Sequence, residues 1–290
     1  MSLRKPGRSG PVIGSPGTYR TMLILRYAIL VVLALVFLTP FYVMLKIGLS
    51  TNAEILNTSF TFFPGSPNWS KVTDTLSDPA FQSALLNSGI IAVLGTGGQI
   101  ILGAMAGYGL ARIPNRAARP VFAAILLVLL IPAATTFLPV YVIVVQLGWV
   151  STLRGLIVPT LFSAFNVFLF RQFFLNFPKE LEEAGRIDGL GYFGTFLRIV
   201  VPNTLPFASA LTVLGFVASW NAFLWPLVVA GNSQSSQTVQ VYLSSFLTAQ
   251  TFDYPGLFMA ALLSIVPLLI VFFVLQRYLV RGVSETGITG

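Results

Sequence analysis

The chain has no cysteine and no histidine among its 290 residues, and only 9% of its residues are charged. The lack of cysteine excludes disulfides and thiol catalysis, and the lack of both residue types excludes His/Cys metal sites and histidine-based catalytic triads. We therefore expect neither a metal nor a cofactor. The charged share is also far below the roughly 25% of a typical soluble domain, which argues against a soluble core.

Apolar residues make up 55% of the chain instead, and the mean hydropathy is +0.83. This composition is typical of a polytopic membrane protein, and we predict an all-α fold with six transmembrane helices. The predicted spans cover approximately residues 27–45, 86–110, 121–144, 156–173, 205–230 and 257–276. They form a membrane domain over residues 27–281, between a basic tail at residues 1–26 and a short tail at residues 282–290.

Two of the predicted spans contain residues that alter a plain helix. Pro132 and Pro139 predict a kink or an unwound turn in the third span, which either lines a path through the membrane or serves packing alone. Gly103 and Gly107 in the second span have the spacing that lets two helices approach closely.

The 17 basic residues indicate the topology. With these spans, every Lys and Arg lies on one side except Lys46, Lys71 and Arg154. By the positive-inside rule, the basic side, which holds both termini, is cytoplasmic. The basic residues are scattered singly and form no patch, so the net charge of +8 does not indicate nucleic-acid binding.

No Asp or Glu falls inside a predicted span. Ion-coupled carriers usually need ionisable groups within the membrane, and membrane proteases need a buried Asp pair or a Ser/His set. The chain also has no Walker A sequence with which to bind ATP itself. If it transports a solute, a separate ATPase subunit is expected to supply the energy, and this chain is not itself an enzyme.

The segment 178–206 is too polar for lipid and predicts two helices joined by a glycine turn on the cytoplasmic side. Pro178 suits the first turn of a helix, and acidic residues follow it where the helix dipole favours negative charge. Glu182 and Arg186 have the spacing of an ion pair. An apolar stripe consists of Leu181, Ala184 and Ile187.

Gly189 and Gly191 allow the chain to turn after the first helix. A second helical pattern then runs to Pro202, where we expect it to end because proline cannot continue it.

The same segment resembles the EAA loop of the membrane subunits of ABC importers. The resemblance rests on Glu183, Ala184, Gly185, Asp188, Gly189, Ile199, Val201 and Pro202. With Phe196 and Pro206 added, it is similar to the second permease subunit of importers of the maltose and glycerol-phosphate type. Gly185 stands where alanine is usual and Val201 where leucine is usual, and a glycine inside a helix predicts a looser first helix.

The resemblance implies that the first helix is a coupling helix that sits in a cleft of an ATP-binding subunit. It implies three kinds of protein partner: ATPase subunits, a second permease subunit and an extracytoplasmic solute-binding protein. It also implies a sugar as the substrate and a location in the cell membrane of a bacterium or archaeon. Glu183 is the expected charged contact to the ATPase.

Two other classes of function are kept beside this one: an ion-coupled secondary carrier and a non-transporting membrane scaffold or enzyme subunit. In either case the segment 178–206 would be an ordinary amphipathic helix pair at the membrane surface.

Amides beside aromatic residues are the candidates for a substrate path, because such groups hydrogen-bond to sugars and stack on them. The alternative for the tryptophans is the aromatic belt, and for Asn221 a hydrogen bond between helices. The partner permease could equally supply most of the contacts. The candidates are Asn166, Trp220, Asn221 and Trp225.

Overall fold

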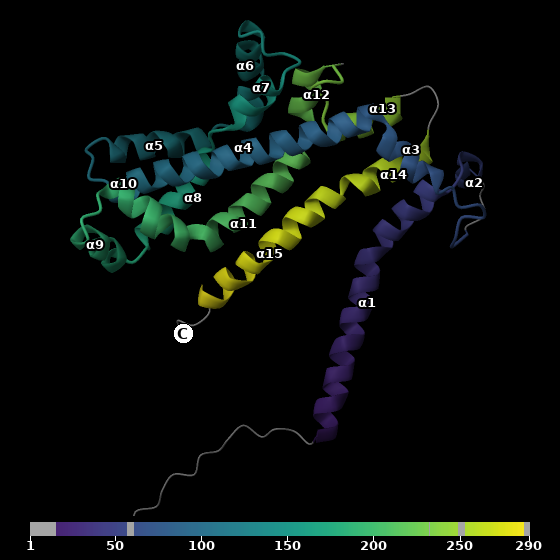
Figure 1. Ribbon diagram of the computed structural model, residues 1–290, viewed down its shortest axis with the longest axis horizontal. Coiled ribbons are helices and arrows are strands. Elements are labelled where there is room, and N and C mark those ends of the chain that lie inside the picture. The colour runs from purple at the N-terminus through teal and green to yellow at the C-terminus, as the bar shows by residue number, and fades with distance from the viewer. Residues whose placement is uncertain (1–15, 57–60, 232, 249–252, 287–290) are drawn as a thin grey trace, which may run out of the picture.

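The computed structural model describes residues 16–56, 61–231, 233–248 and 253–286, and all regular structure in them is helical (Figure 1). The all-α prediction is therefore confirmed. In chain order the elements are α1 (Pro16–Leu49), α2 (Asn52–Leu56), α3 (Ser70–Ser77), α4 (Pro79–Arg112), α5 (Ala118–Leu129), α6 (Ala133–Gln146), α7 (Leu153–Ile157), a 3-10 turn η1 (Val158–Thr160), α8 (Ala164–Leu175), α9 (Lys179–Ile187), α10 (Tyr192–Thr195), a π-helical segment η2 (Phe196–Val200), α11 (Val201–Trp220), α12 (Leu224–Ala230), α13 (Val239–Thr248), α14 (Tyr254–Ser264) and α15 (Val266–Thr286).

Among the described residues, five helical segments are long and apolar enough to cross a membrane. A sixth arises if α5 and α6 count as one span, although they meet at a bend of 101°. The predicted kink lies at Pro132, the residue before α6, whereas α6 continues through Pro139. The five segments are Tyr19–Leu49, Pro79–Arg112, Leu153–Leu175, Tyr192–Trp220 and Tyr254–Arg277.

Several predicted boundaries are wrong. The fifth span does not cover residues 205–230, because α11 ends at Trp220 and the chain is irregular before α12 begins at Leu224. The predicted outer loop at 231–255 contains the helix α13, whose signal is hidden by its polar neighbours in sequence. At the N-terminus, α1 already begins at Pro16, inside the predicted tail, and residues 1–15 and 287–290 lie outside the described residues.

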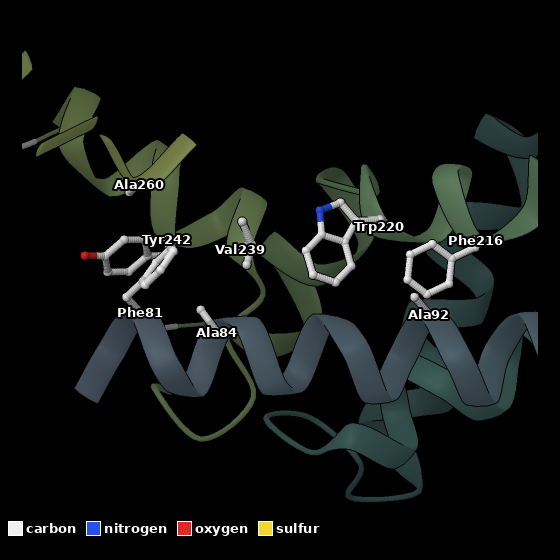
Figure 2. Packing of buried hydrophobic residues seen from close by; sticks show 8 residues of the cluster. All are labelled: Phe81, Ala84, Ala92, Phe216, Trp220, Val239, Tyr242 and Ala260. Carbon is white, nitrogen blue, oxygen red and sulfur yellow. The ribbon is translucent and has the colours of Figure 1, made fainter. Parts of the chain in front are cut away.

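The long helix α4 is the centre of the fold, with α8 and α11 packed along it and α3 and α13 at its first turns (Figure 1). Gly103 and Gly107 face α8, where a Cβ on Gly107 would lie 2.7 Å from the Cβ of Phe170 and 2.8 Å from the backbone N of Arg171. The predicted close approach of two helices is confirmed. On another face of α4, Figure 2 shows an apolar cluster that joins it to α11, α13 and α14; its members are Phe81, Ala84, Ala92, Phe216, Trp220, Val239, Tyr242 and Ala260.

Helix α1 extends away from this body and meets it near its last turn, against α14 (Figure 1). There a Cβ on Gly48 would lie 3.2 Å from the backbone N of Met259, so the two backbones are in close contact. No part of the most apolar stretch of α1 is buried by the other residues that the structure describes. Such a surface is suited to lipid or to another membrane chain.

Candidate functional site

Helix α9 is the predicted first helix of the polar segment, and it runs from Lys179 to Ile187. Pro178 stands just before it with φ −56° and ψ 122°, so it precedes the first turn instead of lying in it. Glu180 and Glu182 lie in the first turn and Arg186 in the last, which complements the helix dipole at both ends. The sequence therefore specifies this helix locally.

The apolar stripe of α9 faces away from the rest of the chain. Ile187 is 87% exposed, Leu181 is 42% exposed and Ala184 is exposed as well. The buried face consists of Glu182 and Gly185. This arrangement is the reverse of an ordinary surface helix, which buries its apolar side. An apolar stripe on an otherwise polar helix outside the lipid is suited to contact with another protein.

Glu182 forms an ion pair with Arg112, the last residue of α4. Its Oε1 lies 3.0 Å from Nε of Arg112, outside hydrogen-bond geometry, and both side chains are at least 93% buried. Nη2 of Arg112 also donates to the carbonyl oxygen of Phe177, just before α9. The predicted pair of Glu182 with Arg186 is therefore wrong: the guanidinium of Arg186 lies 4.8 Å from the ring centroid of Tyr192.

Glu183 is exposed beside the stripe, as its expected role requires. It borders a polar pocket of about 250 Å³ between α9 and the end of α4. The pocket is lined by Ala111, Arg112, Lys179, Glu182, Glu183 and Arg186.

Gly185 and Ile199 come together although they are far apart in the loop. A Cβ on Gly185 would lie 2.4 Å from Cδ1 of Ile199, so the isoleucine fills the space that a side chain at position 185 would take. Helix α9 is continuous through Gly185, and its expected looseness stays a prediction. The glycine lets α9 lie against η2.

Gly189 ends α9 with φ +80°, a conformation that only glycine adopts readily. The N–H of Gly189 donates to the carbonyl of Arg186, and the N–H of Leu190 donates to the carbonyl of Gly185, at 3.0 and 2.9 Å. These two bonds form a Schellman motif, with Asp188 as the last half-helical residue. The predicted glycine turn is confirmed.

Pro202 does not end the second helix, contrary to the prediction. The helix continues from α10 through η2 into α11, and Pro202 lies in the first turn of α11. In η2 the N–H of Val201 donates to the carbonyl of Phe196, five residues back, and this wider turn precedes the proline. A proline in a first turn after a widened turn is compatible with a continuous path, because its missing N–H is not needed there.

The substrate-path candidates lie in different surroundings. Nδ2 of Asn166 lies 3.4 Å from Oε1 of Gln99, whose own Nε2 donates to the carbonyl of Thr160. This polar contact joins α4, α8 and η1. The sequence analysis did not identify Gln99 as a candidate, because no aromatic residue stands beside it.

The other candidates are held by contacts within the chain. Trp220 is 2% exposed and stacks on Phe216 in the apolar cluster of Figure 2. Asn221 is exposed after the end of α11, where its amide donates to the carbonyl of Val217 and accepts from Gln240. Trp225 packs edge-on against Phe137. The candidates make separate contacts among the described residues, and the substrate path stays a prediction.

Comparisons with known proteins agree with these features. Residues 99–285 match the family described as the binding-protein-dependent transport system inner membrane component. The chain is 30% identical to the lactose transport system permease protein of Rhizobium radiobacter, over 89% of this chain and 94% of that one. It is 32% identical to the sn-glycerol-3-phosphate transport system permease protein of Pectobacterium atrosepticum, over 91% of this chain and 96% of that one.

A third relative is the arabinooligosaccharides transport system permease protein of Bacillus subtilis, 29% identical over 94% of this chain and 96% of that one. Among solved structures, the fold is similar to a chain of a bacterial ABC transporter involved in the import of the acidic polysaccharide alginate. That match has a TM-score of 0.76 at 23% identity and covers 90% of this chain and 98% of the other. The chain therefore belongs to the family of inner membrane components of binding-protein-dependent transport systems, as a multi-pass permease subunit of an ABC importer.

Proposed function

We propose that this chain imports a sugar or a related polar solute that an extracytoplasmic binding protein delivers, and that it does so together with a second permease subunit. Separate ATPase subunits drive the import through α9. The observation that carries this proposal is the exposed apolar stripe of α9, ended by the Schellman turn at Gly189. A helix whose apolar side faces away from its own chain has a surface suited to bind another protein.

The substrate class is supported by the relatives and by the charges of the chain. The relatives are named for lactose, for arabinooligosaccharides and for sn-glycerol-3-phosphate. No Asp or Glu lies within the six predicted spans, which suits a solute that is neutral or negatively charged. The buried Nε1 of Trp225 has no hydrogen-bond partner among the described residues, and it is a candidate donor to a sugar hydroxyl.

We infer from the basic residues that α9 lies in the cytoplasm, where ATP is. Arg112, Arg116 and Arg119 lie at the same end of α4 as α9, and α3 and α13 lie at the other end (Figure 1). The positive-inside rule assigns the arginine-rich end to the cytoplasm. The predicted topology assigns both termini to the same side.

Uptake into vesicles tests this function. The importer is assembled in proteoliposomes from this chain, its partner permease, the ATPase and the binding protein, with ATP on the ATPase side. We expect ATP-dependent uptake of one compound from a panel of lactose, arabino-oligosaccharides and glycerol 3-phosphate, and background uptake when the binding protein is omitted. Uptake driven by a proton or sodium gradient without ATP would contradict the proposal.

A further inference from the structure

The chain connects α9 to α8 through residues 176–178, and two further routes connect α9 to α11 and to α4. One is the chain itself, through the turn at Gly189, α10 and η2 into α11. The other is the contact of Glu182 with Arg112 at the end of α4. A movement of α9 is transmitted to the membrane-spanning helices by a route that is stiff and is absorbed by one that bends.

The path along the chain from Gly189 to α11 contains features that allow a helix to bend. In the π-helical segment η2, backbone hydrogen bonds join residues five positions apart instead of four, as from the N–H of Val201 to the carbonyl of Phe196. Pro206 follows inside α11, where it removes a backbone N–H and crowds the preceding turn. This path is therefore able to bend between α9 and α11.

The α4 route is stiff and holds α9 at two points. Arg112 pairs with Glu182 inside α9 and donates to the carbonyl of Phe177 just before it. The guanidinium contacts both groups at once, and burial shields the ion pair from water and salt. A buried charge that loses its partner is strongly unfavourable, so Glu182 resists separation from Arg112.

Helix α4 extends from this ion pair to the opposite side of the protein. It has 34 residues without a break, which corresponds to about 51 Å at 1.5 Å per residue. Near its start, Nδ2 of Asn87 donates to the carbonyls of Ser235 and Gln237, and Oγ of Ser88 accepts from the N–H of Val239. The loop at residues 233–238 and the start of α13 are thus fixed to α4.

The residue before α4 adds a further contact at that end. The hydroxyl of Tyr242 in α13 donates to Oδ2 of Asp78 at 2.6 Å, while Oδ1 of Asp78 accepts from the N–H of Ala80 in the first turn of α4. Both ends of α4 are therefore attached to polar elements outside the apolar span.

We propose that Arg112 is a positioning residue for transport: its ion pair with Glu182 makes α4 the rigid link between α9 and the outer loop at residues 233–238. This rests on the proposed function, in which α9 contacts the ATPase. Glu182 is buried against Arg112 and is not available to the ATPase, whereas Glu183 on the same turn is exposed. In this proposal Glu182 fixes α9 to α4, and Glu183 contacts the ATPase.

Two conservative variants test the link in the fully assembled importer. Arg112→Lys keeps the charge but lacks the planar fork, and Glu182→Gln removes the negative partner. Arg116→Lys and Glu180→Gln are the matched controls, because both residues are exposed and lie nearby. The measurements are assembly with the ATPase, the unstimulated ATPase rate, and the rate stimulated by the loaded binding protein.

We expect both variants to assemble and to keep their unstimulated ATPase rate, while stimulation by the binding protein and uptake per ATP fall about tenfold or more, equivalent to 1.4 kcal/mol. A merely structural role would instead lower assembly and both ATPase rates together. Normal stimulation in assembled variants would overturn the proposal, and so would an equal loss in the two controls. If even the unchanged chain did not bind the ATPase, the proposed function would fail instead.

A covalent link provides an independent test, because the chain has no cysteine of its own. In Arg112→Cys/Glu182→Cys, a reducible thiol-to-thiol cross-linker replaces the ion pair. Stimulation should be present in the cross-linked importer and lost after reduction. Equal stimulation in both states, or failure of this variant and of both conservative variants to assemble, would contradict the link.

Discussion

Replacement of Gly189 by valine is expected to abolish ATP-driven uptake while the chain remains in the membrane. Gly189 has φ +80°, where a residue with a Cβ is strained by about 1–2 kcal/mol and a β-branched residue by more. Beyond its two chain neighbours, no group of the described residues lies within 4 Å of the position of a Cβ, so the effect comes from the backbone and not from a clash. Relief of the strain breaks the Schellman turn and changes the angle at which α9 is presented.

Gly191→Val is the matched control, since Gly191 lies two residues further on in the same turn. Its backbone is extended, with φ −74° and ψ 174°, and a Cβ there also meets open space. Both variants are compared for their amount in the membrane, for uptake and for ATP hydrolysis. Uptake should be lost in the first and largely kept in the second; equal uptake in the two would show that the turn is not required.

Charge reversal of Glu183 is expected to lower uptake by at least about tenfold, because loss of a desolvated charge contact at an interface costs about 2–5 kcal/mol. Glu183 is exposed next to the apolar stripe, so its carboxylate is free to meet a basic residue of the ATPase. Folding should be unaffected, because the buried ion pair of α9 uses Glu182 instead.

Glu180→Lys is the control for Glu183→Lys, since it makes the same charge change on an exposed residue of the same helix. Co-purification of the ATPase with each variant is measured together with uptake. We expect the ATPase to be lost, or uptake to collapse, with Glu183→Lys alone. An equal effect of both changes would indicate a general electrostatic requirement and not a specific contact.

Features with a local cause were predictable from the sequence. The acidic first turn and the apolar spacing of α9 predict that helix, and Gly189 predicts the turn that ends it, because each depends on residues within a few positions. The spacing of Gly103 and Gly107 likewise predicts the close contact of α4 with another helix. These features required no knowledge of the remaining fold.

Features that depend on distant residues were not predictable in this way. Arg112 and Glu182 are brought together only by the packing of α4 and α9, and Arg186, one turn away from Glu182, was the more obvious partner in the sequence. Pro202 predicts a helix end, but the widened turn before it allows the path to continue. The place of Trp220 also depends on distant residues, because it packs in the apolar cluster and lines a cavity of about 880 Å³; its role in the substrate path stays a prediction.

A cysteine at position 187 tests most directly whether α9 contacts the ATPase. Ile187 is 87% exposed, and the native chain has no other cysteine that could react. The variant Ile187→Cys, assembled into the importer and treated with a short thiol-reactive photo-cross-linker, should yield a covalent product with the ATPase subunit; a cysteine at the exposed Trp69, near the other end of α4, should not. Absence of that product, together with labelling of position 187 by a membrane-impermeant thiol reagent added outside intact cells, would contradict the role of α9 as the helix that couples ATP hydrolysis to transport.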